Sequence, residues 1–216
     1  MPGRVIPILY SSLNKRLSDE SWCTYVQWMP DFIQQRINRY RRWEDKQACL
    51  LGKLLILEGL KGLGSGGASL NDLSFDKFGR LFINGPIDFN TSHSGEYVIC
   101  AITDAGRVGV DIERIRPFDL SEIDQYMTAD ELEYIRRASD SSCEFYRIWT
   151  SKESILKADG RGLAVDLREI KIEGQKAALQ GHAWFLREIE VDPHYSCHIA
   201  TNQQDFEHPV REFVFE

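Results

Sequence analysis

Two carboxylates stand two residues apart in the segment Val108-Gly-Val-Asp-Ile-Glu, which ends at Glu113. Its alternation of apolar and acidic residues predicts a β-strand. Alternate side chains of a strand share a face, so Asp111 and Glu113 point the same way, about 7 Å apart, while the valines and the isoleucine face the core. Two oxygen ligands at this spacing can share a hard cation such as Mg²⁺. An ordinary strand with a hydrated polar face would have the same pattern, so this segment leaves both interpretations open.

A third acidic residue lies among lysines in Trp149-Thr-Ser-Lys-Glu-Ser-Ile-Leu-Lys, which ends at Lys157. In a helix, Glu153 and Lys157 are four residues apart and lie on one face, with Lys152 beside them. A carboxylate next to two lysines suits a base that works beside a bound phosphate. The alternative is a surface salt bridge worth only tenths of a kcal/mol.

Polar groups that could hydrogen-bond a phosphate occur in Phe89-Asn-Thr-Ser-His-Ser-Gly, which includes Ser92 and His93. A histidine in a polar turn can equally hydrogen-bond the backbone of that turn. A basic cluster in an otherwise acidic chain is a further candidate. It either binds an anion or forms a hydrated helix face balanced by Glu44 and Asp45. Its members are Arg36, Arg39, Arg41 and Arg42.

The elements that must position these residues form an α+β pattern. Apolar spacing predicts the helices, and alternation with Gly, Pro and Ser boundaries predicts the strands. Thr128 with Glu131 three residues later is a capping box that opens a helix. The predicted helices are 18–28, 31–60, 120–127, a helix from 128 and 143–158; the predicted strands are 4–10, around 75, 81–84, 97–103 and 107–113, with short strands in 170–216.

The order strand, helices, strands occurs twice, with the join near residues 104–108. Two short echoes accompany it, one between 97–101 and 195–200 and one between 53–57 and 152–156. A length of 216 residues fits one large domain or two of about 100. The pattern therefore predicts two similar α/β subdomains, with the natural ligand site at their seam.

Composition excludes several classes of protein. The net charge of −7 argues against nucleic acid or an anionic membrane as the main partner. The most apolar stretch, 48–60, contains Lys53 and Glu58 and is too short to span a bilayer, and no secretion signal is recognisable. The five cysteines are scattered and odd in number, so we expect buried free thiols in a reducing cytoplasm.

The run Gly62-Leu-Gly-Ser-Gly-Gly contains the spacing GxGxxG. A dinucleotide-binding loop needs a strand before it and a helix after it. Here a predicted helix precedes the run and a polar segment follows. We interpret it as the end of a helix rather than a phosphate-binding loop.

The three segments Phe89-Asn-Thr-Ser-His-Ser, Gly109-Val-Asp-Ile-Glu and Trp149-Thr-Ser-Lys-Glu-Ser-Ile-Leu-Lys, in this order and spacing, resemble the 4′-phosphopantetheinyl transferase superfamily, Sfp type. The resemblance covers residues 36–162. It implies a pseudo-twofold fold of two subdomains, each a small, mostly antiparallel sheet with packed helices. We expect residues 1–105 to bind the adenosine phosphate of coenzyme A and residues 106–216 to carry the metal and catalytic residues.

The implied reaction moves the phosphopantetheine arm of coenzyme A onto a serine hydroxyl of an apo acyl or peptidyl carrier protein and releases adenosine 3′,5′-bisphosphate. Mg²⁺ is the expected metal, held by Asp111, Glu113 and Glu153. By the same resemblance Glu153 is the candidate base, and Lys152 and Lys157 bind coenzyme A and offset charge on its leaving phosphate.

The resemblance also implies where coenzyme A binds. Ser92 and His93 would contact a phosphate of coenzyme A, and Arg36 and Arg39 would hold its 3′-phosphate. The turn at Arg80 resembles a Gly-Lys-Pro turn near the adenine, although Arg replaces Lys and Leu follows it in place of Pro. Ala48 stands where some relatives have an arginine.

The carrier would dock after Pro117, where Tyr126 and Met127 could meet an apolar helix of the carrier and Arg136 and Arg137 its acids. Alternatively, Tyr126 and Met127 are simply part of the hydrophobic core. We expect a cytoplasmic monomer. Two other functions compete with this one: a non-catalytic module that binds coenzyme A or a carrier, and another metal-dependent nucleotide phosphotransferase.

Overall fold

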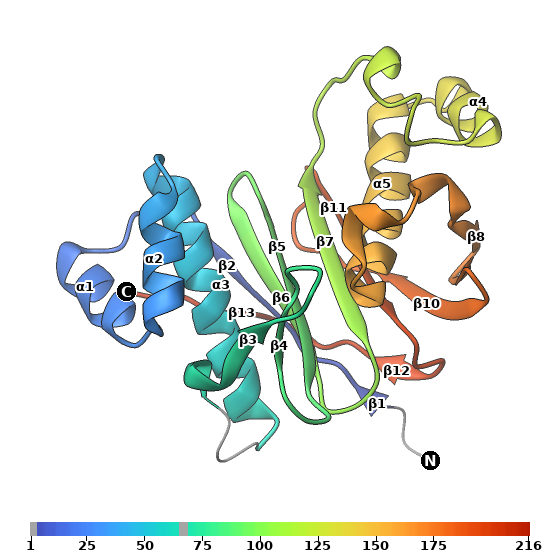
Figure 1. The fold of residues 1–216 in the computed structure, drawn as a ribbon. Coiled ribbons are helices and arrows are strands. Elements are labelled where there is room, and N and C mark those ends of the chain that lie inside the picture. The colour runs from blue at the N-terminus through green and yellow to red at the C-terminus, as the bar shows by residue number, and fades with distance from the viewer. Residues whose placement is uncertain (1–3, 65–68) are drawn as a thin grey trace. The chain divides into compact units, whose positions relative to one another are not determined.

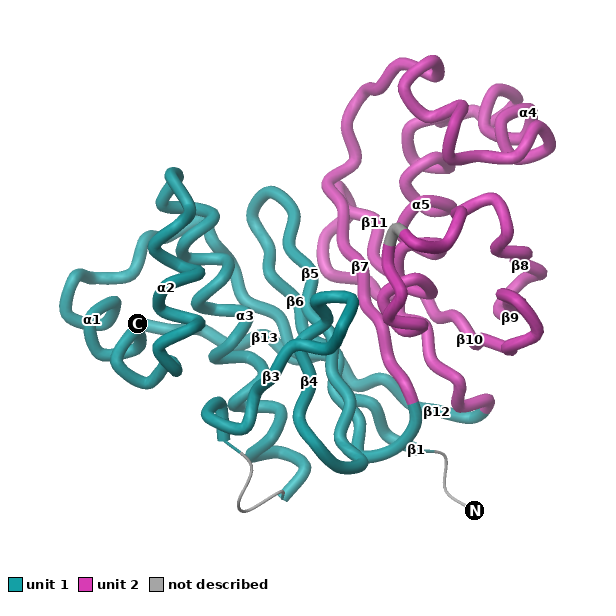
Figure 2. Tube along the Cα trace, in the orientation of Figure 1, with its two compact units in different colours: residues 1–106, 205–216 teal, residues 107–204 magenta. Residues whose placement is uncertain are grey.

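The computed structural model describes residues 4–64 and 69–216, and its chain divides into two compact units (Figures 1 and 2). Unit 1 consists of residues 1–106 and 205–216, and unit 2 consists of residues 107–204. The helices are α1 (Asp19–Gln27), α2 (Asp31–Arg39), α3 (Trp43–Gly62), α4 (Ala129–Arg137) and α5 (Ser141–Asp159). Four 3-10 turns span Leu70–Asp72, Leu120–Glu122, Gly162–Ala164 and Leu167–Glu169. The strands are β1 (Arg4–Val5), β2 (Ile8–Ser12), β3 (Leu73–Phe75), β4 (Leu81–Ile83), β5 (Asp88–Ser94), β6 (Tyr97–Thr103), β7 (Val108–Arg114), β8 (Lys171–Glu173), β9 (Lys176–Leu179), β10 (His182–Glu188), β11 (Tyr195–Thr201), β12 (Phe206–Glu207) and β13 (Val210–Glu212).

Unit 1 is built on a four-stranded sheet of order β13-β2-β6-β5. β6 pairs antiparallel with both β2 and β5, and β13 pairs parallel with β2. α3 packs on β6, and its two small residues Gly52 and Gly59 face Val98 and Ile102 of that strand. Absent side chains at these two positions let the helix approach the sheet closely.

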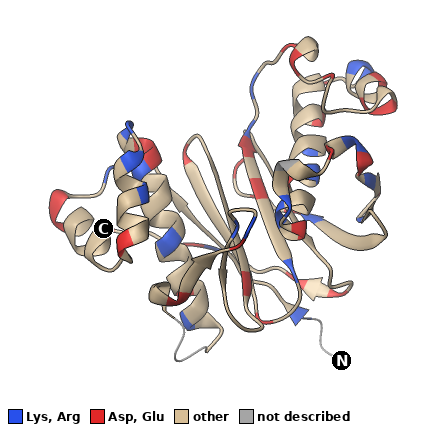
Figure 3. Cartoon of the chain, in the orientation of Figure 1, with Lys and Arg blue, Asp and Glu red and all other residues tan. Residues whose placement is uncertain are grey.

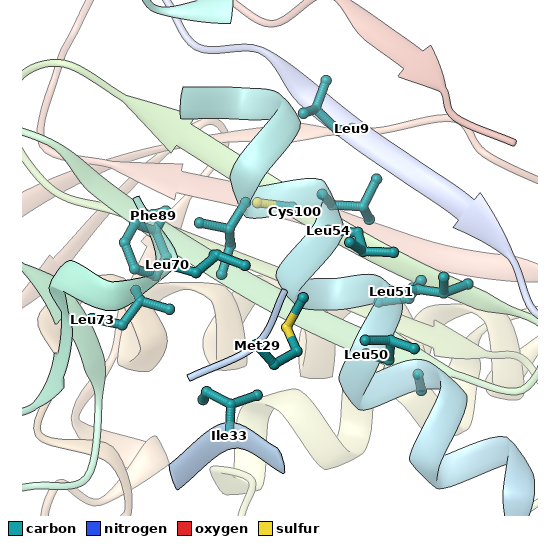
Figure 4. Packing of buried hydrophobic residues seen from close by; sticks show 14 of the residues in the cluster. Leu9, Met29, Ile33, Leu50, Leu51, Leu54, Leu70, Leu73, Phe89 and Cys100 are labelled. Atoms are coloured by element: carbon teal, nitrogen blue, oxygen red, sulfur yellow. The ribbon is translucent and has the colours of Figure 1, made fainter. Parts of the chain in front are cut away.

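The core of unit 1 lies between this helix and the sheet. Figure 4 shows Leu54 of α3 near Cys100 of β6, and Leu51 of α3 and Leu9 of β2 belong to the same cluster. Ile33 of α2 joins the same cluster from the other side of α3. Burial of these apolar side chains, each worth about 1.5–3 kcal/mol relative to exposure, holds α3 on the sheet and α2 on α3.

The single helix predicted over 31–60 is wrong, because the structure divides it into α2 and α3. The backbone is extended at Tyr40 and again at Arg42, with ψ of 144° and 142°. This break lets α2 fold back, so that Ile33 and Ile37 both bury against α3. Periodicity continues across the break, which is why the sequence pattern does not mark it. The helix predicted over 120–127 is likewise reduced to the 3-10 turn Leu120–Glu122.

Unit 2 is built on a five-stranded antiparallel sheet of order β7-β11-β10-β9-β8. α5 packs against both β7 and β11. Their register sets Asp111 opposite His198 and Glu113 opposite Ser196. The apolar core under α5 includes Ile155, Leu156, Trp184 and Leu186.

The two units share one plan. In unit 1 the sheet contains β2-β6-β5 with α3 on β6, and in unit 2 it contains β7-β11-β10 with α5 on β11. The two sequence echoes fall on matching elements, the first on β6 and β11 and the second on α3 and α5. The prediction of an α+β fold with small, mostly antiparallel sheets and packed helices is confirmed.

The sequence-based division put all of 106–216 in one subdomain, and the structure differs for the last twelve residues. Residues 205–216 belong to unit 1, because β12 pairs with β1 and β13 pairs with β2. No sequence signal marks which sheet a short, late strand joins.

Three other sequence-based expectations can be compared with the structure. α3 ends at Gly62, and most of the glycine run after it, 65–68, lies outside the described residues. Within residues 4–64 and 69–216, no helix combines the length and the apolar content that crossing a membrane requires. All five cysteines are free, but Cys23 and Cys143 are exposed, so the expectation that every thiol is buried is wrong.

The tail yields a test of this assignment. Phe213 packs on the core of unit 1 and its amide donates to the Tyr10 carbonyl at 2.8 Å, whereas the next side chain, Val214, is 76% exposed. We predict that Phe213→Ser lowers the free energy of unfolding by roughly 1–3 kcal/mol, and that Val214→Ser changes it by less than about 0.5 kcal/mol. Urea denaturation of the two variants measures both values, and equal effects would contradict the placement of the tail.

Candidate active site

The site in unit 2 depends on a close approach between α5 and β7 at Gly109. A Cβ atom at this position would overlap the carbonyl oxygen of Ser154 and the amide nitrogen of Ala158, both on the α5 backbone. No side chain fits there, so the glycine is required by contact rather than by backbone angle. The helix therefore lies almost directly on the strand.

This contact orients the acidic residues. Gly109 faces α5, and side chains two residues apart on a strand share a face, so Asp111 and Glu113 also lie on the α5 side of the sheet. Asp111 is only 3% exposed. The interpretation of β7 as an ordinary strand with a hydrated polar face therefore does not hold for Asp111.

The end of α5 is fixed to the same strand. The guanidinium Nε of Arg107 donates to the Ala158 carbonyl at 3.0 Å, and Gly160 closes the helix in the left-handed region with a φ of 90°. A cation at the carboxyl end of a helix satisfies free carbonyls and is favoured by the helix dipole. α5 is thus held to β7 at two successive turns.

Glu153 and Lys157 project from α5 toward these acids. Lys157 Nζ is 2.5 Å from Asp111 Oδ1. The pKa of Glu153 is raised, first by burial and then by the negative charges of Asp111 and Glu113, while Lys157 opposes the rise. The three carboxylates are therefore close enough to repel one another, with one ammonium group among them.

Asp111, Glu113 and Glu153 lie near one another, but their oxygens are not arranged as a set of metal ligands. Within the described ranges, no set of three His, Cys, Asp or Glu side chains is arranged to hold a metal ion. The donor set nevertheless fits a hard divalent cation, because it consists of carboxylate oxygens whose mutual repulsion a cation would relieve.

Lys152 lies elsewhere. Its side chain is fully buried, and its Nζ donates to Glu131 Oε2 at 2.6 Å. The same Glu131 oxygen accepts the Thr128 amide in the capping box that opens α4. Burial lowers the pKa of Lys152, and Glu131 opposes that shift. Lys152 thus secures α4 to α5, a role that its place beside Glu153 in the sequence does not reveal.

A buried polar network joins α5 to β11 behind the acids. The Thr150 hydroxyl donates to the Tyr146 carbonyl at 2.8 Å, and its oxygen lies 2.9 Å from Ser196 Oγ and 2.8 Å from His198 Nδ1. Burial, with Arg147 nearby, lowers the pKa of His198 to about 4, so the ring is neutral at pH 7. Because Thr150 has one proton and gives it to Tyr146, we assign the His198 proton to Nδ1.

In unit 1, the residues predicted to contact coenzyme A are distributed over β5 and α2. Ser92 is buried on β5 and the adjacent His93 is exposed. Arg39 is exposed on α2, and the Arg36 guanidinium lies over the Phe75 ring, 5.6 Å from its centroid. Figure 3 shows the basic residues of α2 and α3 in unit 1 and, within unit 2, the acidic residues of β7.

Arg80 is committed to the fold of unit 1. Its Nη2 donates to both carboxylate oxygens of Asp88, at 2.9 and 2.8 Å, and to the Phe89 carbonyl at 3.1 Å. The two side chains are 7% and 8% exposed. The guanidinium therefore anchors the β3–β4 hairpin to β5, which does not fit the predicted contact with coenzyme A.

The docking hypothesis at Met127 is wrong in one respect. Met127 is 2% exposed and packs in the apolar cluster with Ile123 and Ile135. Tyr126 is 37% exposed and contacts Trp149 edge to face, with ring centroids 5.6 Å apart. Only Tyr126 of this pair presents surface to a partner.

Comparisons with known proteins bear on the identity of the site. Residues 107–210 match the family model described as the 4′-phosphopantetheinyl transferase superfamily. The chain is 34% identical over 144 residues to 4′-phosphopantetheinyl transferase gsp of Aneurinibacillus migulanus, covering 65% of this chain and 60% of that protein. It is 26% identical over 215 residues to 4′-phosphopantetheinyl transferase Sfp of Bacillus subtilis, covering 94% and 96%. To 4′-phosphopantetheinyl transferase HetI of Nostoc it is 32% identical over 179 residues, covering 77% of this chain and 75% of the relative.

The chain belongs to the 4′-phosphopantetheinyl transferase superfamily. The resemblance inferred from the three motifs is confirmed, and with it the enzyme class, a transferase of 4′-phosphopantetheine. Unit 2 contains most of the residues that the family model matches.

Sequence reasoning predicted that Asp111, Glu113 and Glu153 of this phosphopantetheinyl transferase act together, but it missed three residues that position the helix carrying Glu153. Glu131 is recognisable as a capping residue, and nothing in the sequence indicates that it also pairs with Lys152. Thr150 and His198 lie 48 residues apart, and only the packing of α5 on β11 brings them together.

The glycine contact can be tested with a matched pair of substitutions. Gly109→Ala places a methyl group on the α5 backbone, and we predict that it lowers the free energy of unfolding by roughly 3 kcal/mol or more. Gly62→Ala is the control, because nothing lies within 4 Å of its added Cβ. Thermal unfolding followed by circular dichroism separates the two, and a Gly109→Ala variant as stable as Gly62→Ala would refute the contact.

Proposed function

We propose that this transferase moves the 4′-phosphopantetheine arm of coenzyme A to a serine hydroxyl of an apo acyl or peptidyl carrier protein. The observation that carries the proposal is the set of three carboxylates and one lysine at the contact of α5 with β7, where Lys157 pairs with Asp111 and Glu153 is close enough to be repelled by Asp111 and Glu113. Such a set can bind a diphosphate through cations and can accept a proton beside it.

We assign Asp111, Glu113 and Glu153 as the residues that would hold Mg²⁺. When bound, the ion would offset the negative charge of the diphosphate and polarise its phosphorus. The support is chemical: carboxylate oxygens are the ligands that Mg²⁺ takes from proteins. The pKa of Glu153 is raised first by burial and then by the negative charges of Asp111 and Glu113, which a bound cation would offset.

The chain's own residues perform the proton transfer and part of the charge stabilisation. The carrier serine oxygen forms a bond to the phosphorus next to the pantetheine arm, and the bond from that phosphorus to the bridging oxygen breaks. Glu153 is the carboxylate that accepts the serine proton. Lys157 donates to the departing phosphate, so adenosine 3′,5′-bisphosphate leaves.

For coenzyme A we propose Arg36 and Arg39 as contacts to the 3′-phosphate, and Ser92 and His93 as phosphate contacts. Arg36 and Arg39 are accessible cations, and within residues 4–64 and 69–216 no acidic side chain forms an ion pair with either. We leave Lys152 and Arg80 out of this set, because both are buried in ion pairs. Lys152 pairs with Glu131 and Arg80 pairs with Asp88.

The remaining expectations are proposals of the same kind. We propose that the enzyme is a cytoplasmic monomer whose partners are coenzyme A and the carrier, with neither nucleic acid nor membrane. The free state of all five cysteines fits a reducing compartment.

The assay uses purified protein with Mg²⁺, coenzyme A and an apo carrier, and measures the carrier mass. We predict a gain of one phosphopantetheine arm per carrier. No gain with retained coenzyme A binding would favour a non-catalytic module, and transfer only between nucleotides would favour another phosphotransferase.

The role of Glu153 is tested on the same assay. Glu153→Gln keeps the shape of the side chain but removes its charge, and we predict a loss of rate on the order of 10²–10⁴-fold, with coenzyme A binding largely retained. Glu144→Gln is the control on the same helix, since Glu144 only pairs with Arg147 near the surface. A Glu153→Gln variant that keeps its rate would remove Glu153 from the mechanism.

The raised pKa of Glu153 also predicts a pH dependence of stability. Burial and the neighbouring acids disfavour the charged form of Glu153 in the folded chain. The resulting loss of folding stability is absent below the ordinary carboxyl pKa of about 4.3, and it is complete above the raised pKa of the folded chain. Without metal, Glu153→Gln should therefore raise Tm at pH 7–8 and leave it unchanged near pH 4. Added Mg²⁺ should raise the Tm of the unaltered protein at pH 7–8 more than that of the variant, and equal shifts would argue against Glu153 as a ligand.

A further inference from the structure

Unit 1 contains a pocket lined by basic residues. The pocket has a volume of about 180 Å³ and is bordered by the segment before α1, by α1 itself, by the end of α2 and by the start of α3. α1 and α2 both contact α3 (Figure 1). α3 contributes Trp43, Lys46 and Gln47 to the pocket lining. Its lining residues are Arg16, Trp22, Asn38, Arg41, Trp43, Lys46 and Gln47.

The charged groups that line this pocket are all positive. It offers two guanidinium groups and one ammonium group, two indole rings and two carboxamides, and none of the lining residues is acidic. Guanidinium and ammonium donors bind phosphate oxygens strongly, and indole rings provide flat walls for a planar group. In a chain of net charge −7, this concentration of positive charge is local.

Gln47 holds the pocket together. It is 1% exposed, its Oε1 accepts the Leu17 amide at 2.9 Å and its Nε2 donates to the Lys15 carbonyl at 2.8 Å. These two hydrogen bonds bind the backbone of Lys15 and Leu17, the residues on either side of Arg16. The buried amide therefore brings Arg16 to the start of α3, beside Lys46.

The positive charges of the pocket are not balanced by the described protein. No side-chain hydrogen bond or ion pair of Arg41 or Lys46 occurs within residues 4–64 and 69–216. Arg16 approaches Asp19 only to 3.9 Å, and both side chains are mostly exposed, which makes that pair weak. The nearby Glu44 pairs with Arg42 instead. Like charges held together in this way are stabilised by a bound anion.

The pocket is distinct from the residues proposed for coenzyme A. Asn38 lies two residues after Arg36 on α2, so the two side chains project from nearly opposite faces of that helix. Arg36 rests on Phe75, which is not part of the pocket. The arginine cluster recognised in the sequence is therefore divided between two places.

We propose that this pocket binds a phosphoryl group, either as inorganic phosphate or on a small nucleoside phosphate. Arg41 and Lys46 donate to the phosphate oxygens, Arg16 adds charge, and Trp22 and Trp43 supply the walls. A nucleoside phosphate would stack its base on an indole, whereas inorganic phosphate would use the cations alone. The proposal does not rest on the transfer reaction, because it concerns other residues and needs neither carrier nor Mg²⁺.

The test is a titration of the full chain, free of coenzyme A, followed by tryptophan fluorescence at constant ionic strength. The probes are inorganic phosphate, adenosine 5′-monophosphate, adenosine and sodium chloride. We expect a saturable change with at least one phosphate-bearing probe and none with adenosine or chloride. Tighter binding of the nucleotide than of inorganic phosphate would identify the nucleoside source.

Two double variants assign the signal to the pocket. Arg41→Gln with Lys46→Gln should weaken the apparent affinity roughly tenfold or more. Lys171→Gln with Lys176→Gln removes the same charge from exposed positions on β8 and β9 and should leave the affinity unchanged. Circular dichroism confirms that both variants are folded. An unchanged affinity in the pocket variant, an equal loss in the control variant, or an equal response to adenosine alone would overturn the proposal.

Discussion

The direct contact of α5 with β7 at Gly109 is the constraint on which the rest of unit 2 depends. The strand backbone and the helix backbone meet there without an intervening side chain, so the acids of one and the acid and lysine of the other face each other across a short distance. A wider spacing would leave Asp111 paired only with solvent and Glu153 without the neighbours that raise its pKa. Two further contacts hold α5 in place on the sheet. Arg107 binds the carboxyl end of the helix, and Thr150 contacts His198 of β11.

Unit 1 uses the same plan for a different purpose. In both units glycine lets the helix approach the sheet closely: Gly52 and Gly59 of α3 in unit 1, and Gly109 of β7 in unit 2. The strand that matches β7 is β2, and its residues Ile8-Leu-Tyr-Ser-Ser include no carboxylate. One helix-on-sheet scaffold thus supports a cluster of acids in unit 2 and cationic surfaces on α2 and α3 in unit 1. Function follows the side chains that the scaffold presents, not the scaffold itself.

The motifs predicted the acids of the site, because strand and helix periods alone decide which side chains share a face. Asp111 with Glu113, and Glu153 with Lys157, needed no tertiary information. The partners of Lys152 and Arg80 could not be predicted, since Glu131 and Asp88 are joined to them only by packing. The same holds for Met127, whose apolar character fits a docking surface and a core equally well until its burial is known. The break between α2 and α3 escaped prediction because apolar spacing runs through it.

The return of residues 205–216 to unit 1 has a consequence for synthesis on the ribosome. All of unit 2 is one continuous stretch, so it can complete its sheet while the tail is still being made. β13 follows unit 2 in the sequence, so β2 gains its parallel neighbour only after all of unit 2 has been synthesised. Unit 2 can therefore fold first, and the β2 edge of the unit 1 sheet stays open in the meantime.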